Sequence, residues 1–273
     1  MSRNFKIKLS YIKLYTGIAL SLAIVVSILS LIIINGLSHV SFEFIFSLSA
    51  PMGQSLAPML VTTLILVLFT LLMSVPIGIG CAIYLNEYAS NKSNFIKFIR
   101  ICIETLSGIP SILYGLFGFL FFVLQLRWSW SILAGIFTVS IMILPIIIRS
   151  TEEALKSVPV SYRMGSFALG AGKFYTIRKV ILPSAINGIL ASIILSIGRI
   201  VGETAALLLT AGTVVGMPST LFSSAATLSV FMYTITAEAA DMDRAYATAI
   251  VLMTLVFCLN LFANFIAKKL KKG

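Results

Sequence analysis

Long apolar runs are the feature that most constrains the fold of this chain. A helix needs about 20 consecutive apolar residues to cross the hydrocarbon core of a bilayer. With 59% hydrophobic and only 11% charged residues among 273, the chain has too little polar surface for a soluble fold. We therefore predict an all-α integral membrane protein with six membrane-spanning helices. The six runs that meet the length requirement cover residues 16–37, 57–85, 101–124, 130–149, 185–210 and 245–267.

Basic residues are grouped between the apolar runs, and this grouping predicts the orientation in the membrane. Cytoplasmic connections of membrane proteins carry an excess of Lys and Arg. The groups mark every second connection, so both termini are expected in the cytoplasm. The net charge of +11 is therefore assigned to membrane topology and not to nucleic-acid binding. The four groups lie at residues 3–13, 92–100, 149–179 and 268–272.

An arginine and a glutamate interrupt the apolar run 185–210. Arg199 and Glu203 lie in the stretch SIGRIVGETAALLL, and on a continuous helix their spacing would place them on one face. An ionised side chain near the bilayer centre costs roughly 2.5–3.5 kcal/mol on insertion scales, so neither is expected to face lipid. Two interpretations stay open. The two charges form a structural ion pair, or they line a solute path together with Gly202 and Thr204.

Small residues and helix breakers add expectations about packing. Small residues repeat every four positions along 184–196, which predicts that this helix is central in the bundle. The stretch Gly108-Ile109-Pro110-Ser111 predicts a helix break, and Gly108, Pro110 and Ser111 are candidate gate residues. The alternative is an ordinary kink between packed helices. In the outer connection 211–244, residues 221–235 are apolar enough for a short helix.

No catalytic pattern competes with a transport function. The three cysteines lack metal-ligand or CxxC spacing, and the single His39 lies at the edge of an apolar run. Gly172-Lys173 is similar to the end of a nucleotide-binding loop, but Phe167 and Phe174 replace residues that a Walker A pattern requires. We therefore expect no enzymatic activity, no bound cofactor and no metal in this chain.

The basic connection of about 150–184 has the pattern of a docking element. Residues 161–172 form a short helical pattern that ends in glycines suited to a helix C-cap. Its apolar Phe167 and Leu169 are flanked by Arg163 and Lys173. A short exposed helix between two spans can transmit force from a soluble partner. The alternative is a solvated basic loop that only follows the charge rule for cytoplasmic connections.

Several motifs resemble those of ABC importer permeases. The pattern Leu169-Gly170, nine intervening residues and then VILP at 180–183 is similar to the EAA loop of these proteins. Four further motifs, which follow one another within about residues 60–210, resemble motifs of the phosphate-importer permeases of the PstA type. Ala206 stands where the family pattern GETAPL has proline. The motifs are AIYLNEY at 82–88, SGIPSILYGL at 107–116, MILPIIIRSTEEAL at 142–155 and GRIVGETAAL at 198–207.

The resemblance implies a type I ABC importer permease fold similar to that of methionine importers. Residues 1–56 would form a first helix and outer loop, and residues 57–273 the transmembrane core with its coupling loop. The implied function is to import inorganic phosphate across the bacterial cell membrane with a second, related permease. Two copies of a cytoplasmic ATPase would use ATP-Mg, and an extracytoplasmic binding protein would deliver phosphate. The implied ATPase contacts are Arg163, Gly165, Phe167, Ala168, Leu169, Gly170, Leu182 and Pro183.

Arginine suits phosphate because its planar fork donates two charge-assisted hydrogen bonds. A neighbouring carboxylate could hold Arg199 in place or accept a hydrogen bond from protonated phosphate, which fully ionised sulfate cannot donate. Two other functions stay open at this point. One is an ABC permease for sulfate or another oxyanion. The other is an ion-coupled secondary transporter that uses Arg199 and Glu203 as a proton relay.

Overall fold

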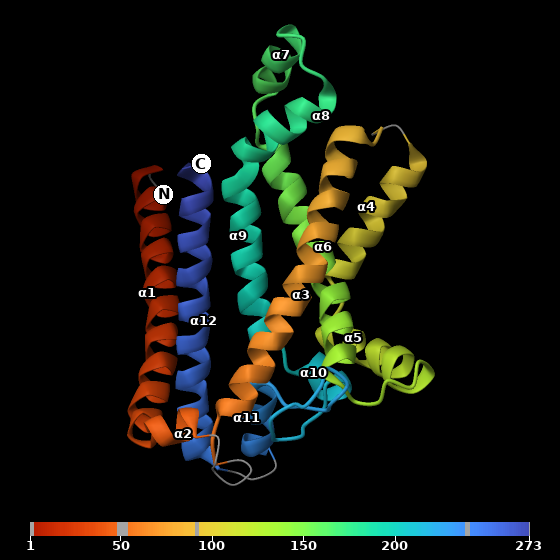
Figure 1. Ribbon diagram of the computed structural model, residues 1–273. Helices are drawn as coiled ribbons and strands as arrows, with labels where there is room; N and C mark the ends of the chain where they lie inside the picture. Colours follow the sequence, from red (N-terminus) through yellow and green to blue (C-terminus); the bar gives the residue numbers. More distant parts are fainter. Residues whose placement is uncertain (1–2, 48–53, 91–92, 238–240, 273) are drawn as a thin grey trace.

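The computed structural model describes residues 3–47, 54–90, 93–237 and 241–272, and this part of the chain is helical without strands (Figure 1). Within it, five helices are long and apolar enough to cross a membrane. These are α1 (Arg3–Gly36), α3 (Ala57–Ile83), α6 (Ile132–Lys156), α9 (Leu182–Val201) and α12 (Met242–Lys272). The shorter segments are η1 (Leu37–His39), α2 (Phe42–Phe46), η2 (Tyr84–Tyr88), α7 (Val160–Ala168), α8 (Lys173–Thr176), η4 (Ile177–Ile181), α10 (Ala205–Thr210) and α11 (Leu228–Ala237).

The sixth predicted span is broken. It consists of α4 (Asn94–Ser107) and α5 (Ser111–Gly118), which continues as η3 (Phe119–Gln125), and the two halves meet at 101°. The structure confirms the helix break that Gly108-Ile109-Pro110-Ser111 predicts. Pro110 has no N–H to donate and disfavours helical conformation in the residue before it. The Tyr114 hydroxyl donates to the Leu106 carbonyl at 2.8 Å and braces the two halves across the break.

The central helix of the bundle is α6. In its membrane-spanning window 67% of the residues are buried, against 33% for the span that contains α9. Helix α9 packs against α3, α6 and α12, so it lies within the bundle and not at its periphery, as predicted, although α6 is the more buried of the two. The small residues of α9 still serve a close contact. A Cβ atom added at Gly188 would lie 2.5 Å from the Ala154 Cβ, so α9 lies directly against α6 there. The repeat of small residues along 184–196 predicts that two helices lie close together, but it does not tell which helix is most buried.

The run 185–210 also ends earlier than predicted. Helix α9 stops at Val201, and the chain leaves the helical conformation before α10 begins at Ala205. The short outer helix expected at 221–235 is displaced toward the C-terminus, because α11 covers Leu228–Ala237. Both corrections concern the end of the molecule opposite α7 (Figure 1). Its shape is set by contacts between segments that hydropathy does not report.

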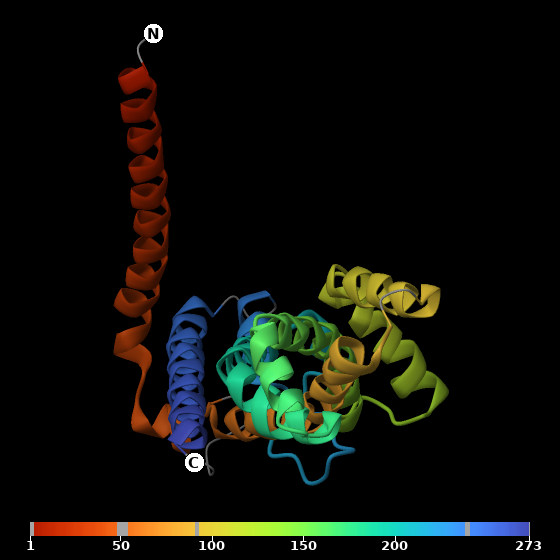
Figure 2. The same ribbon diagram turned by 90° about the horizontal axis from the view of Figure 1, so that it is seen from above.

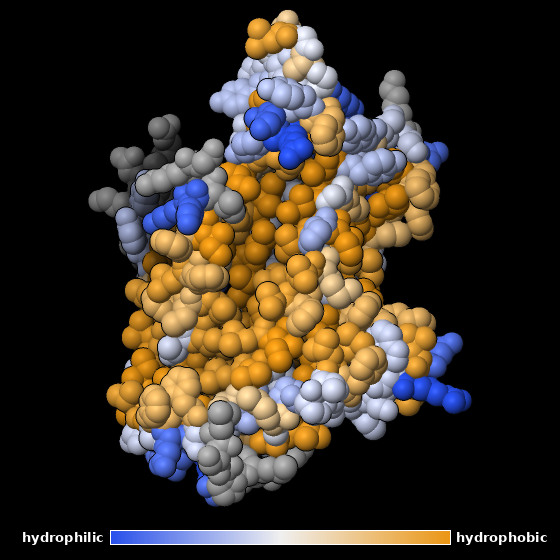
Figure 3. Space-filling model, viewed as in Figure 1, coloured by the Kyte–Doolittle hydropathy of each residue, from blue (hydrophilic) through white to orange (hydrophobic). Residues whose placement is uncertain are grey.

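The start of α1, the end of α12 and helix α7 lie at the same end of the molecule (Figure 1). Seen from above, α1 leans away from the other helices (Figure 2). It meets α12 at Gly36, where an added Cβ would lie 2.7 Å from the Tyr246 backbone. A broad apolar band covers the side of the molecule, and polar residues gather at its two ends (Figure 3). The chain is therefore a multi-pass membrane protein.

We predict that the end carrying α7 is cytoplasmic. Single cysteines placed at the exposed positions Ser129 and Ser219 should react with a membrane-impermeant thiol reagent in intact cells. A cysteine at Ser157, which is exposed at the opposite end, should react only after the membrane is permeabilised. The background is a variant that lacks the three native cysteines. Labelling at Ser157 in intact cells would contradict this orientation.

Candidate functional site

A compact hairpin projects from the end of the bundle, and we call residues 160–176 the tip. Helix α7 ends in a Schellman motif, in which Gly170 takes a left-handed conformation with φ of 81°. Its N–H donates to the Phe167 carbonyl at 2.9 Å, and the Ala171 N–H donates to the Ser166 carbonyl at 3.2 Å. The hydroxyls of Ser166 and Thr176 lie 2.8 Å apart and join α7 to α8. The tip is therefore an ordered element.

The tip projects beyond the apolar band and carries exposed apolar side chains among polar ones (Figure 3). The Leu169 side chain is 89% exposed, and Ala168 and Gly165 are also exposed. Nothing lies within 4 Å of a Cβ added at Gly165, so this face is open to a neighbour. Exposed apolar patches of this kind mark interaction surfaces. The exposed large side chains are Val160, Tyr162, Met164, Phe167, Leu169, Phe174 and Tyr175.

Three of the residues expected at the partner contact lie outside the exposed apolar surface of the tip. Leu182 packs against the apolar cluster below the tip, and Pro183 lies in the first turn of α9. Arg163 turns inward, and its guanidinium donates to Glu87 Oε1 at 2.8 Å and to the Leu155 carbonyl at 3.2 Å. The Arg163 side chain is 19% exposed and that of Glu87 is 8% exposed. Arg163 therefore holds the tip to η2 and to the end of α6.

We expect Arg163→Ala to destabilise the purified protein, because it leaves the Glu87 carboxylate buried without its partner. Breaking a buried ion pair costs roughly 3–5 kcal/mol, which should lower the thermal unfolding midpoint in detergent. The double variant Arg163→Met with Glu87→Met should recover most of the loss, since it removes both charges. Arg149→Ala serves as the control. It breaks ion pairs among side chains that are 49% to 69% exposed, so its effect should be much smaller. Equal midpoints for Arg163→Ala and the wild type would show that the contact does not hold the tip.

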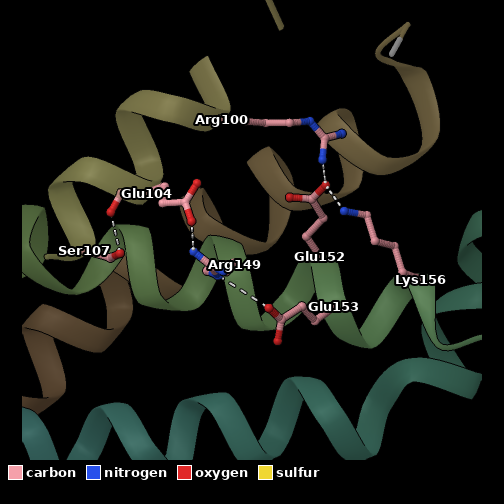
Figure 4. Close-up of polar contacts among 7 residues, drawn as sticks. All are labelled: Arg100, Glu104, Ser107, Arg149, Glu152, Glu153 and Lys156. Carbon is pink, nitrogen blue, oxygen red and sulfur yellow. Dashed lines mark hydrogen bonds and ion pairs between the residues drawn. The ribbon is translucent and has the colours of Figure 1, made fainter. Parts of the chain in front are cut away.

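A network of charges joins α4 to α6 below the tip (Figure 4). Glu152, which is 8% exposed, pairs with Arg100 of α4 and with Lys156 at 2.8 Å. Arg149 contacts Glu104 at 3.2 Å and Glu153 at 3.4 Å. Ile96 of α4 is buried in an apolar cluster, and Ile99 and Ile103 pack against the same cluster, so apolar packing and ion pairs together hold α4 in place. The charges surround a cavity of about 230 Å³.

Glu203 lies outside any helix and has its own partners. Its Oε1 accepts a hydrogen bond from the Ala206 N–H at 3.2 Å, and its backbone carbonyl accepts one from the Ser229 hydroxyl at 2.6 Å. Gly202 closes α9, and Thr204 precedes the first residue of α10. Glu203 is 7% exposed and joins α9, α10 and α11. Arg199 and Glu203 therefore do not lie on one continuous helix, and no ion pair joins them.

Arg199, unlike Glu203, lies within a helix. It lies in the last turn of α9, where a positive charge complements the helix dipole, and it is exposed. Arg100, Arg149 and Arg163 each pair with a carboxylate, whereas Arg199 forms no ion pair with any described residue. It faces a cavity of about 530 Å³ that is otherwise mainly apolar. The residues around it are Ile146, Ile194, Leu195, Ser196, Gly198, Arg199 and Asn260.

The described residues contain no group of three His, Cys, Asp or Glu side chains that could hold a metal ion. At Gly108 the N–H donates to the Thr105 carbonyl at 3.1 Å, Pro110 caps α5, and Ser111 is its first residue. These three residues form the 101° break. A gating role for them stays a prediction.

Together, the broken and continuous spans and the projecting tip define the membrane subunit of an ABC importer. The chain belongs to the family described as binding-protein-dependent transport system inner membrane components, whose sequence model matches residues 74–272. Its fold is similar to that of a subunit in the crystal structure of a bacterial alginate ABC transporter. The TM-score is 0.72 at 17% identity, covering 97% of this chain and 95% of that one. For the inward-facing MetNI methionine ABC transporter, the TM-score is 0.61 at 19% identity, over 79% of this chain and 94% of that one.

Curated relatives are similar in sequence as well. The phosphate transport system permease protein PstA of Mycobacterium leprae is 31% identical over 269 residues, which cover 95% of this chain and 88% of that protein. The probable ABC transporter permease protein YqgI of Bacillus subtilis is 39% identical over 198 residues, which cover 70% of this chain and 67% of that protein. A PstA homolog of Mycoplasma pneumoniae is 37% identical, but the match covers only 29% of that longer protein. Like its family, this chain is a transporter membrane component and not a catalytic subunit.

Proposed function

We propose that this chain is the membrane-spanning permease subunit of an ATP-driven importer of inorganic phosphate in the bacterial cell membrane. The observation that carries the proposal is Arg199, a guanidinium that faces a cavity of about 530 Å³ without a carboxylate partner among the described residues. A cation that is left unpaired inside an apolar wall is a binding element for an anion. The relatives named as phosphate permeases support phosphate as that anion.

The guanidinium of Arg199 is suited to bind and release an oxyanion in turn. Its planar fork can donate two hydrogen bonds to two oxygens of the same phosphate. Because the Glu203 carboxylate accepts from the Ala206 N–H and forms no ion pair with Arg199, it does not compete with the anion for Arg199. The same engagement argues against a proton relay between Arg199 and Glu203, as an ion-coupled carrier would need. Sulfate would meet Arg199 in the same way, so the residues of α9 favour oxyanions as a class.

The energy for transport would come from partner proteins. In the proposed assembly, a second, related permease shares the path, and each permease seats its tip on one of two cytoplasmic ATPases that use ATP-Mg. An extracytoplasmic binding protein delivers phosphate. The apolar tip supports this arrangement because its exposed side chains need a protein neighbour outside the membrane. From Leu182 to Arg199, helix α9 runs 17 residues, or about 26 Å, from the tip toward the cavity.

We expect Arg199→Ala to abolish phosphate uptake while the importer still assembles. The anion loses its charged partner in this subunit, so uptake of radiolabelled phosphate in cells should fall at least a hundredfold, given that hydrogen bonds to charged groups contribute about 1.5–3 kcal/mol each. Glu203→Gln is the matched control. It keeps an oxygen for the Ala206 N–H and should retain most of the uptake. Normal uptake by Arg199→Ala would contradict the assignment, and sulfate uptake by the wild type in place of phosphate would contradict the substrate.

We expect Leu169→Glu to separate the permease from its ATPase. A charged side chain on the most exposed apolar residue of the tip should prevent burial against a partner, because an unpaired charge is costly to desolvate. The ATPase should no longer co-purify, and phosphate-dependent ATP hydrolysis should fall about tenfold or more. Leu169→Met keeps the apolar surface and should behave like the wild type. If Leu169→Glu retains both the ATPase and uptake, the tip is not the docking surface.

A further inference from the structure

A second cavity lies beside the charge network of α4 and α6, and its wall is basic. It has a volume of about 240 Å³ and is lined by Asn86, Ile96, Lys97, Arg100 and Lys156. Three of these side chains are cations, and none of the described lining residues is a carboxylate. A concave surface lined by charges of one sign concentrates the opposite ion. The cavity is therefore suited to an anion.

The positive charge around this cavity exceeds what the nearby carboxylate neutralises. Glu152 lies between Arg100 and Lys156 and pairs with both (Figure 4). Lys97 is exposed and forms no ion pair with any described residue. The other carboxylates of the network contact Arg149 on the wall of the neighbouring cavity of about 230 Å³. At the basic cavity, one negative charge is thus set against three positive charges.

The basic cavity lies at the boundary of the membrane. Asn86 lies in the last turn of the candidate span Ala57–Tyr88, and Lys156 is the last residue of the candidate span Ile132–Lys156. Both spans end on the side of the tip (Figure 1). The phosphate groups of lipids lie at this level of a bilayer, directly outside the hydrocarbon core.

An apolar face of α4 leads from this cavity into the apolar band. Ile101 lies one turn after Lys97 on the same side of the helix, and it is exposed, as is Phe98. Helix α4 runs from the side of the tip toward α5 (Figure 1), so Ile101 lies deeper in the membrane than Lys97. A ligand that matches both parts has an anionic head and an apolar tail.

We propose that the basic cavity binds the phosphate group of an anionic phospholipid, whose acyl chains lie along Phe98 and Ile101. Lys97, Arg100 and Lys156 donate charge-assisted hydrogen bonds to the phosphate oxygens. Basic pockets between membrane helices are known to hold lipid head groups in this way. The bound lipid bridges α4 and the end of α6, so it stabilises the folded protein. This site is independent of the solute that the importer carries.

Thermal unfolding of the purified full-length protein in detergent tests this site. Added phosphatidylglycerol should raise the unfolding temperature, because a ligand that binds the folded state stabilises it. Phosphatidylcholine has a head group without net charge, and inorganic phosphate has no acyl chains. Each of these two should therefore give a much smaller increase at the same concentration.

Lys97→Gln tests the contribution of the cavity itself. Because Lys97 forms no ion pair with a described residue, the lipid-free variant should unfold at the wild-type temperature. Its affinity for phosphatidylglycerol should fall about fivefold, the effect of one basic residue at an anionic membrane surface. Lys179→Gln removes an exposed lysine of η4 that does not line the cavity. This matched control should bind phosphatidylglycerol like the wild type.

The outcomes separate the lipid from other ligands. Equal stabilisation by the two phospholipids, or an unchanged affinity of Lys97→Gln for phosphatidylglycerol, would refute the proposal. Stabilisation by inorganic phosphate as large as that by phosphatidylglycerol would assign the cavity to free phosphate and also refute it. Equal losses of affinity in Lys97→Gln and Lys179→Gln would show attraction by the basic surface as a whole and no site. None of these results depends on phosphate uptake, so the proposed function is tested separately.

Discussion

Inside a bilayer, a charged or hydrogen-bonding group has no water to satisfy it, and the arrangement of this molecule follows from that constraint. The buried carboxylates of the described structure have partners. Glu152 is paired from two sides, and the buried Glu87 holds Arg163. These ion pairs stabilise the bundle, and because their carboxylate charges are already neutralised they do not indicate a binding site for a transported solute. Arg199 forms no ion pair with any described residue and faces the cavity of about 530 Å³, and this is why the proposed solute path includes it.

The break after α9 explains why Arg199 does not pair with Glu203. On a continuous helix Glu203 would follow Arg199 by one turn and neutralise it. The chain instead leaves the helix at Gly202, and the Glu203 carboxylate accepts from the Ala206 N–H. A proline at position 206, as in the pattern GETAPL, has no N–H to donate, so this particular contact depends on alanine. Glu203 thereby joins α9, α10 and α11, and the Arg199 guanidinium faces the cavity.

The sequence predicted those features that depend on local chemistry. Hydropathy located the spans because the bilayer acts on each segment separately, and Gly170 was placed at a helix end because a left-handed residue there favours glycine. It did not predict that Arg163 points inward or that Arg100 meets Glu152, because both contacts join residues far apart in the chain. The spacing of Glu152 and Lys156 was visible as an i,i+4 pair. The division at residue 57 between a first helix and a core domain stays a prediction.

The contacts of the tip indicate how a push from an ATPase would spread. Arg163 ties the tip to η2 and to the end of α6, and α8 continues through η4 into α9. Helix α9 lies against α6 at Gly188 without room for a side chain. The tip, α3, α6 and α9 therefore form one packed body, in which no single helix can bend alone without loss of these contacts. Because packed cores shift as units, the geometry favours rotation of this whole body over bending of α9. Arg199 and the cavity would move together with the tip.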